Sequence, residues 1–133
     1  MEKMRGVTLK IITENGGEAS LFQSEAVYEK TSDGERILYR IENDEGELFF
    51  AESFLEMCRR GECGLSVRFC EGKESEMTLS SSELEGKLSV NTTRYKVKRD
   101  RAGSETELCY RLGRDAVQTF SLKIQVLFFS EEK

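Results

Sequence analysis

The stretch QTFSLKIQVLFF, from Gln118 to Phe129, decides the fold class. Every second side chain in it is apolar, and the residues between them are polar up to Leu127. Alternation with a period of two predicts a β-strand with one buried face and one wet face. The buried face is expected to consist of Phe120, Leu122, Ile124, Val126 and Phe128.

The length of this strand indicates how the sheet ends. At about 3.3 Å per residue it would run roughly 36 Å, longer than most strands of globular proteins. A long apolar strand on an open edge would invite aggregation, and a sheet closed on itself has no such edge. We therefore predict an all-β fold, a single antiparallel barrel of about 8 to 10 strands joined as a meander.

Shorter alternating runs fill the rest of the chain, and turn residues of the types Gly, Asn, Asp and Ser separate them. The expected strands are Met4–Thr13, Glu18–Lys30, Arg36–Glu42, Leu48–Phe50, Phe54–Arg59, Leu65–Cys70, Met77–Ser80, a run from Gly86 onward, and Glu105–Leu112. Asn43–Gly46 and Glu71–Glu76 are interpreted as turns between them.

The alternation also predicts how neighbouring strands pair. The apolar faces of Phe54–Arg59 and Leu65–Cys70 coincide when Arg59 lies opposite Leu65. Further along, the apolar positions change parity near Thr92, which predicts a β-bulge or a strand break there.

Charge and length limit the classes of partner. The 133 residues suit one domain, residues 1–133, and the net charge of −5 repels nucleic acid and anionic membrane. One basic cluster exists, and the aligned faces place Glu107 and Glu105 opposite its lysines. The cluster is Arg94, Lys96, Lys98, Arg99 and Arg101. We expect neither a nucleic-acid nor a membrane partner.

The start of the chain and its hydropathy predict the compartment. No apolar segment approaches the roughly 18 residues of a membrane-spanning helix, and Met1–Gly6 leads directly into an alternating run. We therefore expect a cytoplasmic protein.

The residue types present exclude several chemistries. The chain contains no histidine, so histidine acid/base catalysis is impossible and a structural zinc would need four thiolates. The four cysteines match no common zinc spacing and are expected to be reduced, without a Cys58–Cys70 disulfide. Acidic groups such as Asp44 with its neighbours are interpreted as solvated turns. We expect no catalytic residue, no metal site and no cofactor.

Several strand motifs resemble the YwiB-like family. They include the early hairpin with Ser24–Tyr28 and Ile37–Ile41, the Arg59–Gly61 run, and the later series through Gly86 and Leu108 before a long terminal strand. The family consists of small bacterial proteins of unknown function. The resemblance implies a lipocalin-like (calycin) barrel in the cytoplasm and gives no catalytic residue to carry over. Ser80–Ser82 departs from the aromatic residues that the family tends to have there.

The four tyrosines all fall on faces expected to point inward. Tyr28, Tyr39, Tyr95 and Tyr110 would together line a cavity, and Arg59 would supply a counter-charge for an acid. A barrel of about eight strands can be hollow or filled, so two interpretations stay open. The first is a protein that binds a small apolar or weakly acidic molecule inside. The second is a filled barrel that acts as an interaction or structural module.

The end of the terminal strand carries a different signal. Leu127 and Phe129 are apolar on the face expected to be wet. Exposed apolar pairs are typical of contact surfaces, so this pair is either covered by a neighbouring loop or forms a homodimer contact.

Overall fold

A computed structural model describes residues 4–81, 85–113 and 118–128. These residues form ten β-strands, and no helix that could cross a membrane lies among them. The strands are β1 (Met4–Asn15), β2 (Glu18–Lys30), β3 (Glu35–Ile41), β4 (Asp44–Phe50), β5 (Phe54–Arg60), β6 (Gly64–Cys70), β7 (Glu74–Ser80), β8 (Glu85–Asp100), β9 (Gly103–Leu112) and β10 (Gln118–Phe128).

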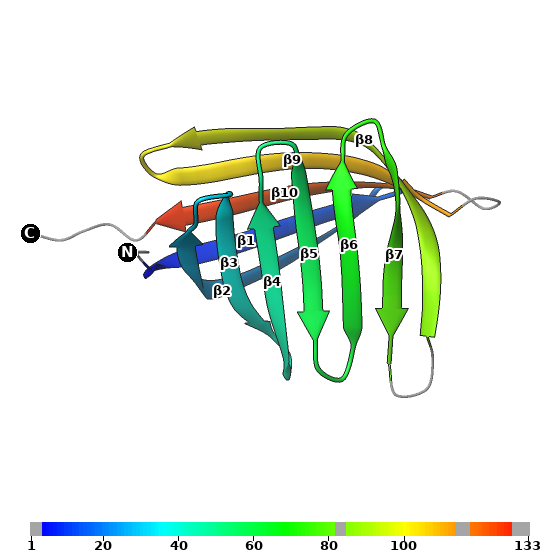
Figure 1. Cartoon of the computed structure of the whole chain (residues 1–133), viewed down its shortest axis with the longest axis horizontal. Coiled ribbons are helices and arrows are strands. Elements are labelled where there is room, and N and C mark those ends of the chain that lie inside the picture. The colour runs from blue at the N-terminus through cyan, green and yellow to red at the C-terminus, as the bar shows by residue number, and fades with distance from the viewer. Residues whose placement is uncertain (1–3, 82–84, 114–117, 129–133) are drawn as a thin grey trace, which may run out of the picture.

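The strands form one closed antiparallel barrel with meander connections. Each strand pairs with the next, and β10 returns to pair with β1, for example Ile124 with Ile11. The predicted all-β meander barrel is therefore confirmed. In Figure 1, β3 to β7 form an upright layer, and β1, β2, β9 and β10 run across it.

The strand β8 connects these two layers. Its first part pairs with β7 and its second part with β9, and the register shifts between Thr92 and Arg94. The predicted irregularity near Thr92 is thus a bulge, and bulges bend a strand. The expected pairing of Arg59 with Leu65 is also confirmed, as is that of Glu107 with Lys96.

The core fills the space between the two layers. Its largest fully buried side chains come from every part of the chain, so neither layer buries its apolar face alone. They are Val7, Leu9, Ile37, Leu48, Leu55, Phe69, Val90, Thr92, Thr106, Leu108, Ile124 and Val126. The apolar face predicted for the terminal strand lies in this core or packs against it.

Two predicted turns are wrong in their bounds. The turn before β4 consists of Glu42 and Asn43 alone, and Glu42 adopts a left-handed conformation with φ of 56°. Asp44 therefore belongs to a strand and faces inward, 2% exposed, so its interpretation as a solvated turn residue is wrong. The other turn ends earlier than expected, because β7 begins at Glu74.

The barrel has two different ends. At the hairpin end lie the turns that join β1 to β2, β3 to β4 and β5 to β6. At the terminal end lie Met4 and Phe128, together with the turns that follow β2 and β4.

Candidate functional site

An inward-facing row of residues crosses the upright layer near the hairpin end. Strand pairing places its members side by side from β3 to β8. This mouth row consists of Tyr39, Gly46, Arg59, Leu65, Leu79 and Gly86. The next row toward the terminal end contains Leu48 and Val67, which are 0% and 4% exposed. In contrast, Leu65 and Leu79 are only partly buried. The inner face of the layer is thus open to solvent at its hairpin end.

A hollow of about 530 Å³ lies over part of the mouth row. Its surface is mostly apolar and includes Leu65, Leu79 and Leu88, and the polar residues that line it include Arg59, Glu85 and Lys87. Leu88 faces inward beside Met77 yet is 36% exposed. Exposed apolar side chains that line a concavity are typical of ligand sites.

Arg59 is held at the border of the hollow by a buried carboxylate. Its Nε donates a hydrogen bond of 2.7 Å to Oδ2 of Asp44, and its Nη2 lies 3.5 Å from Oε1 of Glu42. The hydrogen bond from Arg59 lowers the pKa of Asp44, and the Asp44 carboxylate raises the pKa of Arg59. Both groups are therefore charged throughout the neutral range.

Asp44 also fixes the loop between β5 and β6. Its carboxylate accepts hydrogen bonds from the backbone N–H of Glu62 at 2.7 Å and of Cys63 at 3.2 Å. Gly61, with φ of 142°, packs directly against this carboxylate, where a Cβ would overlap it. A single buried acid thus positions one border of the hollow and the guanidinium beside it.

Tyr39 forms the other end of the mouth row. Its ring lies over Gly46, where a Cβ would overlap it, and the Phe22 ring is 5.6 Å away. Burial raises the pKa of Tyr39, and the Arg59 charge partly opposes that shift. The hydroxyl therefore stays protonated near neutral pH and can donate a hydrogen bond.

Tyr110 lies deeper, between two other aromatic rings. Its ring centroid is 4.8 Å from that of Phe69 and 5.3 Å from the stacked ring of Phe120. Burial raises the pKa of Tyr110 to about 12. Beside it, the fully buried Thr92 has no hydrogen-bond partner for Oγ1 within residues 4–81, 85–113 and 118–128.

The remaining two tyrosines lie at the terminal end and support the structure there. Tyr28 donates a hydrogen bond of 2.6 Å to Oε2 of Glu35, and Tyr95 donates one of 3.1 Å to the backbone oxygen of Ala51. Burial, reinforced by the charge of Glu35, raises the pKa of each to about 12. The four tyrosines face inward as predicted, but they do not line one cavity. Tyr39 lies in the mouth row with Arg59, whereas Tyr28 and Tyr95 lie at the terminal end.

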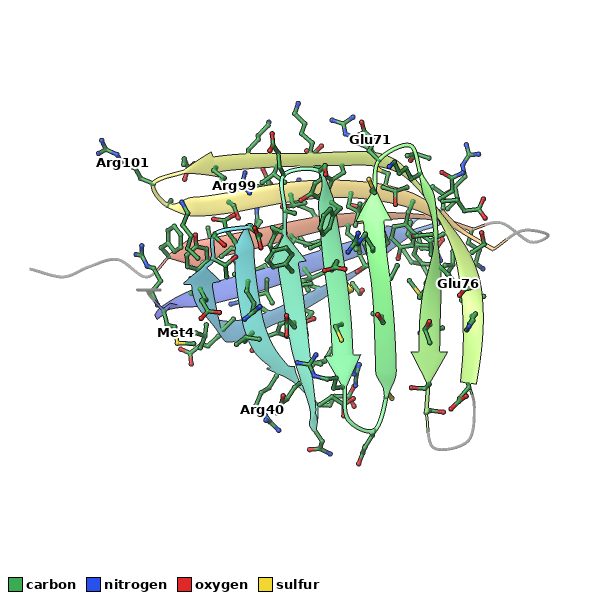
Figure 2. The ribbon with its side chains drawn as sticks, viewed as in Figure 1. Met4, Arg40, Glu71, Glu76, Arg99 and Arg101 are labelled. Carbon is green, nitrogen blue, oxygen red and sulfur yellow. The ribbon has the colours of Figure 1, made fainter. Side chains whose placement is uncertain are left out.

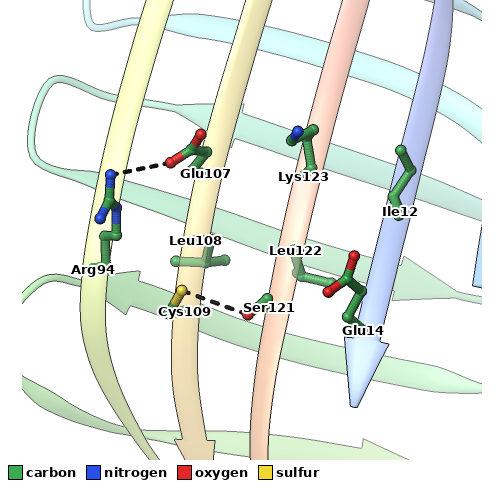
Figure 3. A pocket seen from close by; sticks show the side chains of 9 residues that line it. All are labelled: Ile12, Glu14, Arg94, Glu107, Leu108, Cys109, Ser121, Leu122 and Lys123. Atoms are coloured by element: carbon green, nitrogen blue, oxygen red, sulfur yellow. Dashed lines mark hydrogen bonds and ion pairs between the residues drawn. The ribbon is translucent and has the colours of Figure 1, made fainter. Parts of the chain in front are cut away.

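A second hollow lies outside the barrel wall. It has a volume of about 370 Å³ on β1, β8, β9 and β10 (Figure 3). Arg94 and Glu107 point toward each other across it at 3.2 Å, and Cys109 Sγ lies 3.6 Å from Ser121 Oγ. None of the residues predicted to bind a ligand contributes to this outer groove.

Other predicted features have simple structural outcomes. The four cysteines are free thiols, so the expected absence of a Cys58–Cys70 disulfide is confirmed. Within the described ranges, no group of three His, Cys, Asp or Glu residues could hold a metal ion. Leu127 is half-buried beside Thr8 and Gly103, and Phe129 lies outside the described residues. A homodimer contact through this pair stays a prediction.

Sequence reasoning missed the residues that shape the hollow. The sequence predicts Asn43–Gly46 as a turn, which includes Asp44, whereas the turn consists of two residues, a common hairpin connection. Leu79 belongs to the seven-residue β7, and Leu88 belongs to the first part of β8, which pairs with β7 before the pairing with β9 begins at Val90. Strand pattern alone does not show where one neighbour of a strand ends. The alternation of these two leucines with polar residues was the available signal.

No protein-family model and no curated protein matches this chain. Among solved structures, the chain is similar to the YwiB protein from Bacillus subtilis, with a TM-score of 0.81. The similarity covers 97% of this chain and 94% of that chain at 16% sequence identity. The chain therefore shares its fold with that structure over nearly its whole length, as the sequence resemblance implied.

Proposed function

We propose that this chain, which folds as the YwiB barrel does, is a non-catalytic cytoplasmic binding protein for a small molecule with an apolar or weakly acidic character. The ligand would occupy the hollow at the hairpin end rather than the barrel axis. One observation carries this proposal: the partly buried Leu65 and Leu79 and the exposed Leu88 line one concavity, together with the fixed guanidinium of Arg59.

The filled centre of the barrel directs the ligand to the mouth. In the next row Leu48 and Val67 are buried, and beneath them Phe69 and Tyr110 pack ring against ring. A ligand on the axis would have to displace these side chains, whereas one at the mouth would cover Leu65, Leu79 and Leu88. Covering apolar surface contributes about 25 cal/mol per Å² before the costs of association.

The charge at the border favours weak acids over strong anions. Asp44 already balances Arg59, so the pair has no net charge to attract a strong anion from a distance. Arg59 is still 23% exposed and keeps N–H donors that Asp44 does not occupy. A carboxyl or carbonyl group on an apolar body would suit this arrangement.

The test is a titration with decanoate, an apolar chain that ends in a carboxylate. The chain contains no tryptophan whose fluorescence could report binding, so calorimetry measures it. The chain offers a variant that fills the hollow, Gly86→Val, because no atom lies within 4 Å of a Cβ at this position. We expect Gly86→Val to weaken decanoate binding by at least about tenfold. Leu21→Ser, which changes an exposed residue of β2 that does not line the hollow, serves as the control and should bind as the original chain does.

Two results would contradict the proposal. Decanoate that does not bind at concentrations up to about 1 mM would show that the hollow lacks useful affinity. Equal binding by Gly86→Val would place the ligand elsewhere, with the outer groove of Figure 3 as the next site to test.

A further inference from the structure

One part of β2 lacks a neighbour on one side. The strand pairs with β1 along Glu18–Glu29, but with β3 only along Ala26–Lys30. Among the described residues, Glu18–Glu25 therefore has no strand partner on the side of β3. An unpaired strand edge presents backbone N–H and C=O groups that can accept another strand.

The hairpin turn tells which backbone groups face this edge. Asn15 and Glu18 close a two-residue turn, and such a closing pair exchanges its backbone hydrogen bonds across the hairpin. The backbone N–H and C=O groups of Glu18, Ser20, Phe22 and Ser24 therefore point toward β1. Those of the residues between them point toward the free edge. The residues that face the free edge are Ala19, Leu21, Gln23 and Glu25.

The side chains along this edge are also uncovered. Leu21 is 62% exposed, more than the other large apolar residues that lie exposed on the described surface. On the inner side, Phe22 is partly buried and touches the Tyr39 ring, at the end of the mouth row. An added strand with alternating side chains would cover Phe22 and Tyr39 with one face and lie beside Leu21 with the other.

Charge indicates the chemistry of the added strand. Glu18 and Glu25 flank the edge, both are exposed, and the described residues contain no ion-pair partner for either carboxylate. Arg40 would be the next residue of β3 to pair with β2, but it projects away from the barrel (Figure 2). Basic side chains on the outer face of an incoming strand would balance the two glutamates.

The shape of the barrel favours a single strand over a second copy. In Figure 1, the hairpin ends of β4 to β7 extend past β2. These ends extend in the direction that the free edge of β2 faces. If two copies paired through their β2 edges, the hairpin ends of β4 to β7 in one copy would therefore meet those of the other. One extended segment avoids that collision.

We propose that the free edge of β2, Glu18–Glu25, is a docking site for an extended peptide segment of a partner protein. This segment adds as a strand, with apolar residues at alternate positions and basic residues between them. The site depends on backbone groups of β2 and lies at the opposite end of the mouth row from Gly86, so it does not depend on ligand binding in the hollow.

The test uses the synthetic peptide acetyl-Lys-Val-Thr-Val-Lys-Val-Thr-amide and amide hydrogen exchange. Binding should slow exchange by about tenfold or more at Leu21 and Gln23, whose N–H groups face the edge. A scrambled peptide with its three valines in succession should not protect these amides. Gly86→Val should leave the peptide effect unchanged, which separates this site from the proposed ligand hollow.

Matched variants at Gln23 test the role of the backbone. Gln23→Pro removes an N–H that does not serve the β1 ladder, and edge strands tolerate proline at such positions. We expect it to weaken peptide binding by about tenfold or more, whereas Gln23→Ala, which keeps the N–H, should bind normally. Thermal unfolding should confirm that the Gln23→Pro barrel is folded. Equal binding by Gln23→Pro, or protection that falls outside β2, would overturn the proposal.

Discussion

At the scale of single residues, the buried carboxylate of Asp44 has the widest influence. It accepts three hydrogen bonds, from Arg59 and from the backbone of Glu62 and Cys63, and is 2% exposed. An acid with several donors directed at it is stabilised in its ionised form. The arrangement of the proposed binding site therefore depends on the charge of one residue.

This dependence predicts how stability varies with pH. The pKa of Asp44 is lower in the folded chain than its unfolded value of about 3.9, so folding favours the ionised form. The stabilisation is present above that value and is lost as pH falls through the lower folded pKa. Asp44→Asn should therefore be less stable than the original chain at pH 7, and the difference should shrink toward pH 2.

Chemical unfolding at several pH values from 7 down to 2 measures this effect. Glu45→Gln is the matched control, because the neighbouring residue is exposed on the outer face of the same strand. Its stability should follow that of the original chain at each pH. A difference between Asp44→Asn and the original chain that does not change with pH would show that the charge of Asp44 is unimportant.

Gly46 and Gly86 provide a second comparison between residues of the mouth row. A Cβ at Gly46 would overlap the Tyr39 ring, whereas one at Gly86 would meet nothing within 4 Å. We expect Gly46→Ala to destabilise the fold by about 1–3 kcal/mol and Gly86→Ala to change stability by no more than about 0.5 kcal/mol. Denaturant unfolding measures both. Adding Tyr39→Leu to Gly46→Ala should recover part of the loss, and equal effects of the two alanines would disprove the close packing.

At the scale of elements, the bulge in β8 decides how the two layers meet. Thr93 is the extra residue between the paired positions Thr92 and Arg94, and its hydroxyl donates a hydrogen bond of 3.3 Å to the backbone oxygen of Cys109. Removing Thr93 would leave Thr92 inward and Arg94 outward, so the apolar pattern would survive. The deletion would change only the bend of β8 at this point.

We expect deletion of Thr93 to destabilise the barrel by about 1–3 kcal/mol, because a regular strand cannot turn from β7 to β9 as sharply. Thr93→Ala, which keeps the extra residue and loses only the hydroxyl, is the control and should cost less than about 1 kcal/mol. Denaturant midpoints compare the two. A deletion variant as stable as Thr93→Ala would mean that the bulge does not determine the corner.

At the scale of the whole molecule, closure joins the two ends of the chain. The seam between β1 and β10 pairs Ile11 with Ile124, whereas Ile37 and Leu48 meet across a short hairpin. Long-range strand pairing requires loop closure before it gains contacts, so folding in the range of about milliseconds to seconds is expected.

Variants of two buried isoleucines can test which strands pair first during folding. Ile124 and Ile37 are 0% and 1% exposed, and truncation to alanine should cost each variant about 2–5 kcal/mol. We expect Ile37→Ala mainly to slow folding and Ile124→Ala mainly to speed unfolding, because the local hairpin forms before the seam. Stopped-flow folding and unfolding rates measure this, and the reverse pattern would show that the seam forms first.

The sequence by itself determined the strands, their faces and much of their pairing. Alternation with a period of two identifies which side chains are buried, and matching buried faces fixes registers such as Arg59 opposite Leu65. The parity change near Thr92 likewise located the bulge. These features depend on neighbouring residues, so local pattern is sufficient to predict them.

Only the tertiary structure decided at which position along the barrel axis each inward-facing residue lies. Tyr28, Tyr39, Tyr95 and Tyr110 share an inward direction, but the offset between strands sends them to different depths and ends. The same offset leaves Leu88 exposed and the edge of β2 unpaired. Strand offset accumulates around a closed sheet from every turn and bulge, so no single stretch of the sequence specifies it.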